Sequence, residues 1–303
     1  MKGVVRRFEP MNQFLFRLSL PILLLALSGC GLFPKTVKVG SKNITAQMIV
    51  AEIAAQHLET KGMKIVRRIG MGNAAIVHQA TLSGDLDIYP DDTGTAIAAM
   101  LKETPIQDAD AQYERVRNEY DRLYGLRVIK PLGASNAPVV VVSEALAVKE
   151  GIANLSDSVE NKKAWRLGIT EEFSGRTDGM QTFSSTYRLQ QKEAARILEA
   201  AVLYTALQDN QLDMIIGGES DGMLGTKGLR ILTDDKKIFA PGQLCLLARR
   251  DTVASVPGLE DALTQLSGKI STTALREMGK AVEVDKRPLG DVARDFLKQA
   301  GLR

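Results

Sequence analysis

The sequence predicts an α/β fold made of two lobes that are joined by two crossings of the chain. Strand-like apolar runs alternate with amphipathic helical stretches along residues 36–248, a pattern typical of parallel sheets covered by helices. Two short turn-rich segments, residues 133–138 and 239–243, interrupt this alternation. Because two crossings between lobes form a hinge, we expect a ligand to bind in the cleft between the lobes.

The first lobe is predicted to comprise residues 36–132 and 244–303. Gly62 follows a long helical stretch as its C-terminal cap, and Pro90 is expected to end a strand. The expected strands are residues 36–39, 64–68, 86–89, 127–131 and 244–248, and the expected helices are residues 45–61, 74–83, 96–102 and 110–124.

The second lobe is predicted to comprise residues 139–238, with residues 133–138 and 239–243 as the hinge segments. Its expected strands are residues 139–142, 165–169 and 212–216, and its expected helices are residues 177–191 and 192–206. The strands are short and apolar, as buried strands of such sheets are.

Charge and composition exclude one large class of partner. The chain has 303 residues and a formal net charge of +3. Residues 1–29 carry all of this excess charge, so the remainder is balanced. A charge-neutral body lacks the electrostatic footprint of a nucleic-acid-binding protein, and no nucleic acid partner is expected.

The N-terminus has the pattern of a signal peptide. Basic residues precede an apolar stretch at residues 18–27, and ten helical residues span roughly 15 Å, which is too short for a bilayer core of about 30 Å. The stretch ends Leu27-Ser28-Gly29-Cys30, which matches a bacterial lipobox. We therefore expect residues 1–29 to be removed and Cys30 to be lipidated, giving an exported, membrane-anchored lipoprotein. An ordinary secretory signal with a chance cysteine is the alternative, and Met11 could itself start a complete signal peptide.

The second cysteine is expected to be structural. Cys245 lies in the apolar run 244–248, where a buried core thiol is the simplest interpretation. No metal site or cofactor is expected, because two cysteines provide no zinc or iron–sulfur spacing.

Four loops carry the polar residues that suggest a binding site. They are residues 40–43, 90–95, 171–179 and 217–222, and each follows a predicted strand. Ligands of open α/β sheets bind where strands end and helices begin. In a two-lobed fold, two such loops from each lobe would meet at the cleft.

The motifs in these loops resemble a known family. Val39-Gly40-Ser41-Lys42, the run at residues 84–96 (Gly-Asp-Leu-Asp-Ile-Tyr-Pro-Asp-Asp-Thr-Gly-Thr-Ala), the loop 171–179 and Ser220-Asp221-Gly222 occur in order. Together they resemble the substrate-binding proteins of glycine betaine/choline/carnitine-type ABC importers. The resemblance implies a two-lobed periplasmic-binding-protein fold of type II. It also implies a monomeric, non-catalytic receptor that passes a small molecule to a membrane permease with an ATPase subunit.

The family holds the carboxylate of a zwitterion with Lys, Thr and Arg side chains, and this chain keeps them. Lys42, Thr95 and Arg176 stand at the matching motif positions, and a lysine, a hydroxyl and a fork-shaped guanidinium suit a carboxylate. The alternative is that Lys42 and Arg176 pair with acidic residues on the surfaces of the lobes.

The family's cage of Tyr rings for a quaternary ammonium is absent at the matching positions. Asp92 and Gly242 replace two of the rings, and the segments 136–138 and 217–222 lack the other two. Each cation–π contact contributes roughly 0.5–2 kcal/mol, so their loss should abolish tight capture of a quaternary amine.

Acidic residues stand near the lost rings. A carboxylate suits a primary ammonium or a guanidinium, because these cations have N–H groups to donate. We therefore expect Asp91, Asp92 and Glu219 to contact an amino-acid-like ligand with an N–H-bearing cationic end. In the alternative interpretation Asp91 or Asp92 caps the following helix and Glu219 faces solvent.

The leading function is thus an exported solute receptor, with no catalytic residues expected. An exported enzyme is a weaker alternative, because His57 and His78 lie in predicted helices away from the four loops and no nucleophile or metalloprotease motif occurs. A lipoprotein that senses a ligand without a role in transport is the third class.

Overall fold

The computed structural model describes Gly3 and residues 35–161, 163–239 and 241–303, of which Thr36–Arg303 form one compact unit. The predictions of a signal peptide at residues 1–29 and of lipid at Cys30 fall outside the described residues. Within the described part of the chain, no helix has the length and apolar character needed to cross a membrane.

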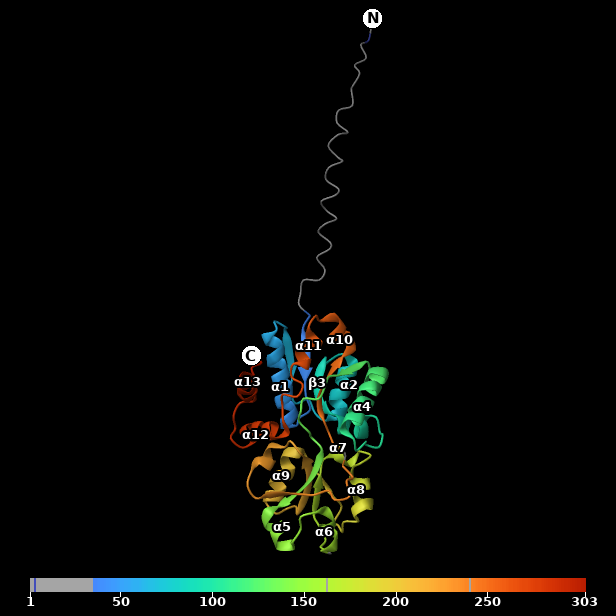
Figure 1. Cartoon of the computed structure of the whole chain (residues 1–303), viewed down its shortest axis with the longest axis vertical. Helices are drawn as coiled ribbons and strands as arrows, with labels where there is room; N and C mark the ends of the chain where they lie inside the picture. Colours follow the sequence, from blue (N-terminus) through green and yellow to red (C-terminus); the bar gives the residue numbers. More distant parts are fainter. Residues whose placement is uncertain (1–2, 4–34, 162, 240) are drawn as a thin grey trace. The chain divides into compact units, whose positions relative to one another are not determined.

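Among the described residues, ten strands form two five-stranded sheets, one for each of the two lobes (Figure 1). The first sheet has the order β2 (Ile65–Arg68), β1 (Val37–Gly40), β3 (Ile88–Asp92), β10 (Leu244–Arg249) and β4 (Leu126–Val128). The second has the order β7 (Arg196–Ile197), β6 (Leu167–Ile169), β8 (Met214–Gly218), β5 (Pro138–Ser143) and β9 (Leu229–Leu232). The lobe limits given above stay a prediction.

Helices cover both faces of the first sheet. Alternate residues of β10 point to opposite faces: Leu244, Leu246 and Ala248 pack in one core cluster, while Cys245 and Leu247 pack in another. The helices of the first lobe are α1 (Thr45–Thr60), α2 (Ala74–Ser83), α3 (Thr93–Thr95), a π-helix at Ala96–Met100, α4 (Ala109–Tyr124), α10 (Arg250–Ser255), α11 (Leu259–Thr264), α12 (Thr272–Glu283) and α13 (Leu289–Gln299). Cys245 is a free thiol with 1% of its surface exposed, so the prediction of a core cysteine is confirmed.

The second sheet is covered in the same way. Val140 and Val142 of β5 pack toward one cluster, and Val141 packs toward the other. The helices of this lobe are α5 (Glu144–Glu150), α6 (Leu155–Glu160), α7 (Glu171–Ser174), α8 (Met180–Tyr187), α9 (Ala200–Gln208) and a 3₁₀-helix at Gly222–Gly225.

The expectation of parallel sheets is confirmed for half of the strand pairings and wrong for the other half. β2, β1 and β3 are parallel, as are β7, β6 and β8, but β10 and β5 are antiparallel to their neighbours. The reason is that β5 and β10 enter their sheets directly from a crossing, without a covering helix. A strand that enters from the cleft edge runs opposite to strands that end at that edge.

Pro90 does not end its strand, contrary to the prediction. In the antiparallel pair of β3 and β10, Pro90 lies opposite Leu246, whose carbonyl faces β4 and accepts a hydrogen bond from Ile129 N. Pro90 is therefore at a non-hydrogen-bonded position on the β10 side. On its other side β1 pairs with β3 at Ile88 alone. The missing N–H of proline thus interrupts no ladder bond.

The two helices predicted at residues 177–191 and 192–206 are replaced by α8, β7 and α9. Arg188 ends α8 in a left-handed conformation with φ of 53°. The chain then runs extended beside β6, where Lys192 N donates to Trp165 O and Leu198 N donates to Ile169 O. Pairing with the free edge of β6 therefore overrides the helix propensity of these residues.

The two crossings lie side by side. Ser135 and Gln243 form an antiparallel bridge, and Asn136 N donates to Gly242 O at 2.8 Å. These bonds join both segments into one connection between the sheets.

Candidate functional site

The last two residues of β3, Asp91 and Asp92, bring two carboxylates to the space between the sheets. Asp92 is the N-cap of α3: its Oδ1 accepts from Thr95 N at 2.7 Å, and its Oδ2 accepts from the Thr95 hydroxyl at 3.0 Å. Gly94 allows this tight turn, because a Cβ at that position would lie 3.2 Å from Asp92 Oδ1 and 3.3 Å from Arg176 Nη2. The capping role considered for Asp92 is therefore real, while a contact of Asp92 with ligand stays a prediction.

Lys42 comes from the loop after β1 and is paired within the site. Its Nζ lies 2.9 Å from Asp91 Oδ1, and both side chains are 1% exposed. Burial alone would lower the pKa of Lys42, but the carboxylates of Asp91, Glu172 and Asp92 hold it above its ordinary value. Lys42 is therefore a buried, permanently charged ammonium.

Asp91 has the opposite electrostatic balance. Burial raises the pKa of its carboxyl to about 6; Lys42 opposes this shift, and the neighbouring Asp92 and Glu172 add to it. One lysine therefore faces three carboxylates at this end of the first lobe.

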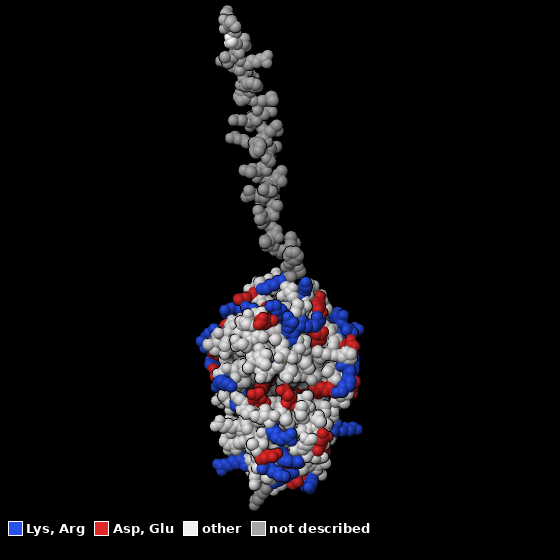
Figure 2. Space-filling model, turned by 180° about the vertical axis from the view of Figure 1, so that it is seen from behind, with Lys and Arg blue, Asp and Glu red and all other residues white. Residues whose placement is uncertain are grey.

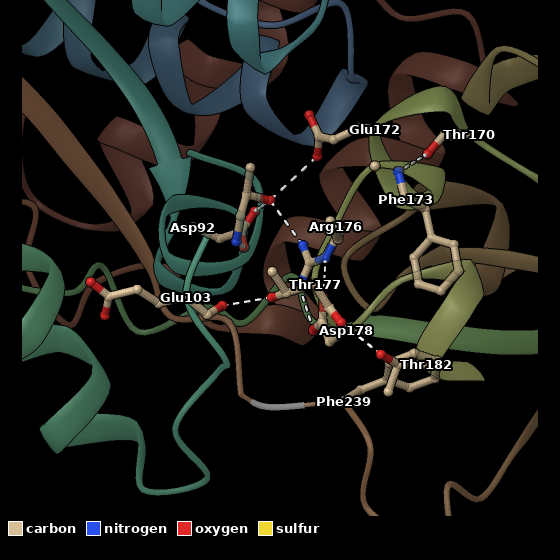
Figure 3. Close-up of polar contacts among 12 residues, drawn as sticks. Asp92, Glu103, Thr170, Glu172, Phe173, Arg176, Thr177, Asp178, Thr182 and Phe239 are labelled. Atoms are coloured by element: carbon tan, nitrogen blue, oxygen red, sulfur yellow. Dashed lines mark hydrogen bonds and ion pairs between the residues drawn. The ribbon is translucent and has the colours of Figure 1, made fainter. Parts of the chain in front are cut away.

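Arg176 enters the site from the second lobe, in the loop after α7. Its Nε and Nη2 donate to the two oxygens of Asp178 at 2.7 and 2.8 Å, and its Nη1 donates to Thr95 Oγ1 at 3.2 Å (Figure 3). Arg176 and Asp178 are 4% and 2% exposed. Two nitrogens of the Arg176 guanidinium therefore bind a carboxylate of the same lobe. The third nitrogen, Nη1, binds Thr95 of the other lobe.

Glu172 is a site residue that sequence reasoning missed. Its carboxylate oxygens each lie 3.4 Å from Lys42 Nζ, and Oε1 lies 3.3 Å from Thr95 Oγ1. The sequence signal was weak, because Glu172 fills a variable position between Glu171 and Phe173 of the motif. Its role becomes visible only when the two lobes are placed together.

Backbone contacts fasten the loop of Arg176 to the first lobe. Thr177 N donates to Ala98 O at 3.2 Å, and the Thr177 hydroxyl donates to Glu103 O at 2.6 Å (Figure 3). Ala98 belongs to the π-helix that continues α3. The site thus sits where the two lobes meet directly.

A small, partly open cleft adjoins these side chains. Its polar lining includes Thr95, Asn136, Glu172, Arg176 and Asp221, and its apolar lining includes Ile44, Phe173, Leu203 and Ile216. Phe173 is the sole aromatic side chain among the described residues that line it. Figure 2 shows acidic side chains along a crevice that crosses one face of the molecule.

Asp221 lines the cleft from the turn that follows β8. It accepts from Gly218 N and from the Tyr204 hydroxyl, each at 2.8 Å, and so fixes the turn after β8. Burial raises the pKa of Asp221 to about 6; the bonds from Gly218 and Tyr204 act in the opposite direction, and the nearby Glu283 acts in the same one.

The structure does not bring Glu219 to the other predicted residues. Glu219 is half-buried and lines a neighbouring cavity with Phe239 and Lys237, on the other side of the crossings. Its backbone is held by Ala137 O and by Arg276, which donates to Glu219 O at 2.7 Å. Lys42, Asp91, Asp92, Thr95 and Arg176, in contrast, form one connected group.

Other aromatic residues of the second lobe serve its packing. Phe239 lies edge-on to Phe173 and is stacked on Phe183, which also contacts Tyr187. These rings form a single cluster behind Phe173. Among the residues that the structure describes, no group of three or more His, Cys, Asp or Glu side chains is placed to hold a metal ion.

A comparison with family models finds one match over nearly the whole described chain. A model described as the substrate binding domain of an ABC-type glycine betaine transport system covers residues 35–299. This agrees with the resemblance seen in the loop motifs.

Characterised relatives point in the same direction. The chain is 28% identical over 294 residues to the carnitine transport binding protein OpuCC of Listeria monocytogenes, covering 94% of this chain and 95% of that protein. It is 27% identical to the glycine-betaine-binding protein of Pseudomonas aeruginosa, over 91% and 93% of the two chains. The ergothioneine transport permease/ergothioneine binding protein EgtU of Helicobacter pylori is 26% identical and is covered over 52% of its length.

Solved structures share the fold. The crystal structure of a glycine betaine/carnitine/choline ABC transporter protein matches with a TM-score of 0.73 and 24% identity, over 88% of this chain and 99% of that one. Lactococcal OpuAC in its closed form with glycine betaine matches with a TM-score of 0.63 and 14% identity, over 88% and 96%. The predicted two-lobed, type II periplasmic-binding-protein fold is therefore confirmed.

Proposed function

The chain belongs to the family of substrate-binding domains of ABC-type glycine betaine transport systems, and we propose that it captures a small zwitterionic or cationic amine with N–H groups on its cationic end. Members of this family are extracytoplasmic components of betaine- and carnitine-type importers and are not enzymes. The ligand is released to a membrane permease that works with an ATPase subunit.

The charge of the site carries the proposal of an N–H-bearing cation. Lys42 and Arg176 provide two positive charges, while Asp91, Asp92, Glu172 and Asp178 provide four carboxylates within the same connected group. The excess negative charge attracts a cation, and carboxylate oxygens accept from an ammonium or a guanidinium. A trimethylammonium has no N–H to donate.

The lining of the cleft supports the same ligand class. A quaternary ammonium is held best by several aromatic faces, and Phe173 is the single ring among the described lining residues. The names of the relatives allow for breadth, because they include proteins that bind carnitine, glycine betaine and ergothioneine.

The position in the cell is a second part of the proposal. The Leu27-Ser28-Gly29-Cys30 sequence supports a lipid on Cys30 that anchors a monomeric receptor at the membrane surface. Incorporation of a labelled fatty acid into the protein, and its loss in a Cys30→Ala variant, would test this. A secreted protein that carries no labelled fatty acid would favour the ordinary signal peptide.

A permease and an ATPase that co-purify with the receptor would support a role in import over a role in ligand sensing.

Calorimetry and thermal shift with a panel of amines test the ligand class. The panel contains glycine betaine, choline, carnitine, ergothioneine, arginine and ornithine. We expect the strongest stabilisation from members with N–H groups on the cation. Strong stabilisation by glycine betaine alone would contradict the argument from the lost cage.

Asp92→Ala tests whether Asp92 contacts ligand in addition to capping α3. We expect a loss of about 1 kcal/mol of stability from the cap, together with a fall in amine affinity of at least about tenfold because a charged contact is lost. The matched control is Asp108→Ala, since Asp108 caps α4 by accepting from Ala111 N at 2.7 Å on an exposed surface. It should lose similar stability with unchanged affinity. Unchanged affinity in Asp92→Ala would refute the ligand contact.

Affinity for an amine should fall as the solution becomes acidic. The pKa values of Asp91 and Asp221 are both raised to about 6, so these groups take up protons as the pH falls from about 7 to about 5. An amine stays charged over this range because its pKa is near 10. Binding a cation favours the ionised carboxylates and must release protons. Calorimetry in buffers of different ionisation enthalpy would detect this release, and an affinity independent of pH would contradict it.

A further inference from the structure

The carboxylate of Glu172 lies where the ligand's own carboxylate is expected. Glu172 reaches from α7 of the second lobe to Lys42 Nζ, with both oxygens at 3.4 Å, and to Thr95 Oγ1, with Oε1 at 3.3 Å. Lys42 and Thr95 are two of the three residues that the family resemblance assigns to the carboxylate of a zwitterion. The Glu172 side chain is 20% exposed, so it enters the site from its rim.

The third anion-binding residue is also satisfied from within the protein. Arg176 uses Nε and Nη2 for the two oxygens of Asp178 and Nη1 for Thr95. A bidentate bond between this fork and a ligand carboxylate would require Asp178, which is 2% exposed, to leave. Lys42 is likewise paired with Asp91 at 2.9 Å. Both cations of the anion-binding half are therefore occupied by carboxylates of the chain.

We propose that Glu172 supplies the carboxylate that a betaine-type ligand would otherwise bring, and that the cleft therefore selects small cations that lack a carboxylate. Such ligands are amines, guanidines or amino alcohols. The inference rests on the proposed function and makes its ligand class narrower. A ligand carboxylate placed beside Lys42 would meet Glu172, Asp91 and Asp92, and like charges at such short distances repel strongly in a buried site.

The cleft offers such a cation a suitable environment. Glu172 and Asp221 both line it, one from the α7 end and one from the turn after β8. Between them the lining includes the Phe173 ring and the apolar side chains of Ile44 and Leu203. A small cation can therefore meet carboxylates while its carbon atoms contact apolar surface.

The test uses pairs of ligands that differ mainly in the carboxylate: agmatine against arginine, putrescine against ornithine, and choline against glycine betaine. Calorimetry at neutral pH should show that the member without a carboxylate binds the unaltered protein at least about tenfold more tightly in the pairs that bind. In Glu172→Gln, which keeps the shape and removes the charge, this preference should shrink or reverse. The variant removes the negative charge that faces Lys42 and Thr95 from the second lobe, so a ligand carboxylate is repelled less there.

Glu171→Gln is the matched control. Glu171 lies in the same first turn of α7 but is exposed and does not line the cleft, so its substitution should leave the ratio of affinities unchanged. A Glu172→Ala variant repeats the test with the side chain removed, and the unfolding transitions of all variants establish that they are folded.

The outcomes separate the inference from the function on which it rests. Tighter binding of the zwitterions by the unaltered protein would overturn the inference and leave an amine receptor in place. An unchanged preference in both Glu172 variants would also overturn it. If no amine of any pair binds any of the proteins, the proposed function itself fails.

Discussion

Replacing Lys42 by methionine is expected to lower the free energy of unfolding by about 3–5 kcal/mol at neutral pH. The Lys42 ammonium is 1% exposed, lies 2.9 Å from Asp91 and 3.4 Å from Glu172, and offsets the charge of Asp92. Its removal leaves three carboxylates together, two of them buried, and removes the cation that pairs directly with Asp91. For a domain of this size the loss corresponds to a fall in melting temperature of roughly 6–20 °C.

The pH dependence of this variant provides a sharper readout than its melting temperature alone. The pKa of Asp91 is already raised to about 6 with Lys42 present, and losing the lysine should raise it further. A carboxyl whose folded-state pKa is above its unfolded value binds extra protons when folded, so acidification stabilises the folded state. Lys42→Met should therefore regain stability as the pH falls from about 7 to about 5.

Two controls test this reasoning. Lys42→Met with Asp91→Leu removes the buried pair as a unit and should recover most of the loss, because apolar residues can replace a buried ion pair. Arg294→Met breaks an exposed pair with Asp291, whose side chains are 43% and 46% exposed, and should cost at most about 1 kcal/mol. A loss as small in Lys42→Met as in Arg294→Met would contradict the role of Lys42.

Arg176→Met is expected to lower both the stability and the affinity of the protein for its ligand. The substitution leaves Asp178 buried without its partner, a change that costs about 3–5 kcal/mol. It also removes the bond from Nη1 to Thr95 Oγ1, which joins the second lobe to the ligand loop of the first (Figure 3). Denaturant titration and calorimetry measure the two effects separately.

The same lobe contains a matched control for Arg176. Arg166 binds Asp213 with the same bidentate geometry, at 3.0 Å from Nε and 2.8 Å from Nη2, but Arg166 is 31% exposed. Arg166→Met should cost about 1 kcal/mol or less and leave ligand affinity unchanged. If Arg176→Met is too unstable to purify, Arg176→Lys keeps the charge and loses the fork, and it should still weaken binding. Equal affinity in Arg176→Lys and the unaltered protein would contradict the prediction.

Much of the fold could be predicted because its signals are local. The apolar runs at 36–39 and 244–248 are buried strands, and Gly84 and Gly125 end helices in left-handed conformations as glycines commonly do. The predictions of secondary structure were wrong where pairing with a strand distant in sequence overrides the local preference. Pro90 is tolerated in β3 because of its register with β10, and Gln191 and Arg196–Ile197 are not helical because they pair along the free edge of β6.

Most residues of the candidate site could be predicted from the sequence, but the ion pairs and hydrogen bonds between them could not. The motifs identified Lys42, Asp91, Asp92, Thr95 and Arg176, and these residues do lie together. The pairing of Lys42 with Asp91 could not be derived, because the two residues come from different loops. Glu219 is charged and stands next to a motif, yet it lines a neighbouring cavity and not the cleft.

The sequence by itself determined the family, the two-lobed fold and the kinds of side chain at the cleft, because these follow from ordered motifs and from local patterns of apolar residues. Only the tertiary structure decided how the charges are balanced. Glu172 and Arg176 belong to one lobe, and Lys42 and Thr95 belong to the other. Electrostatic interactions depend on distance through space and on burial, and neither quantity exists until the lobes are brought together.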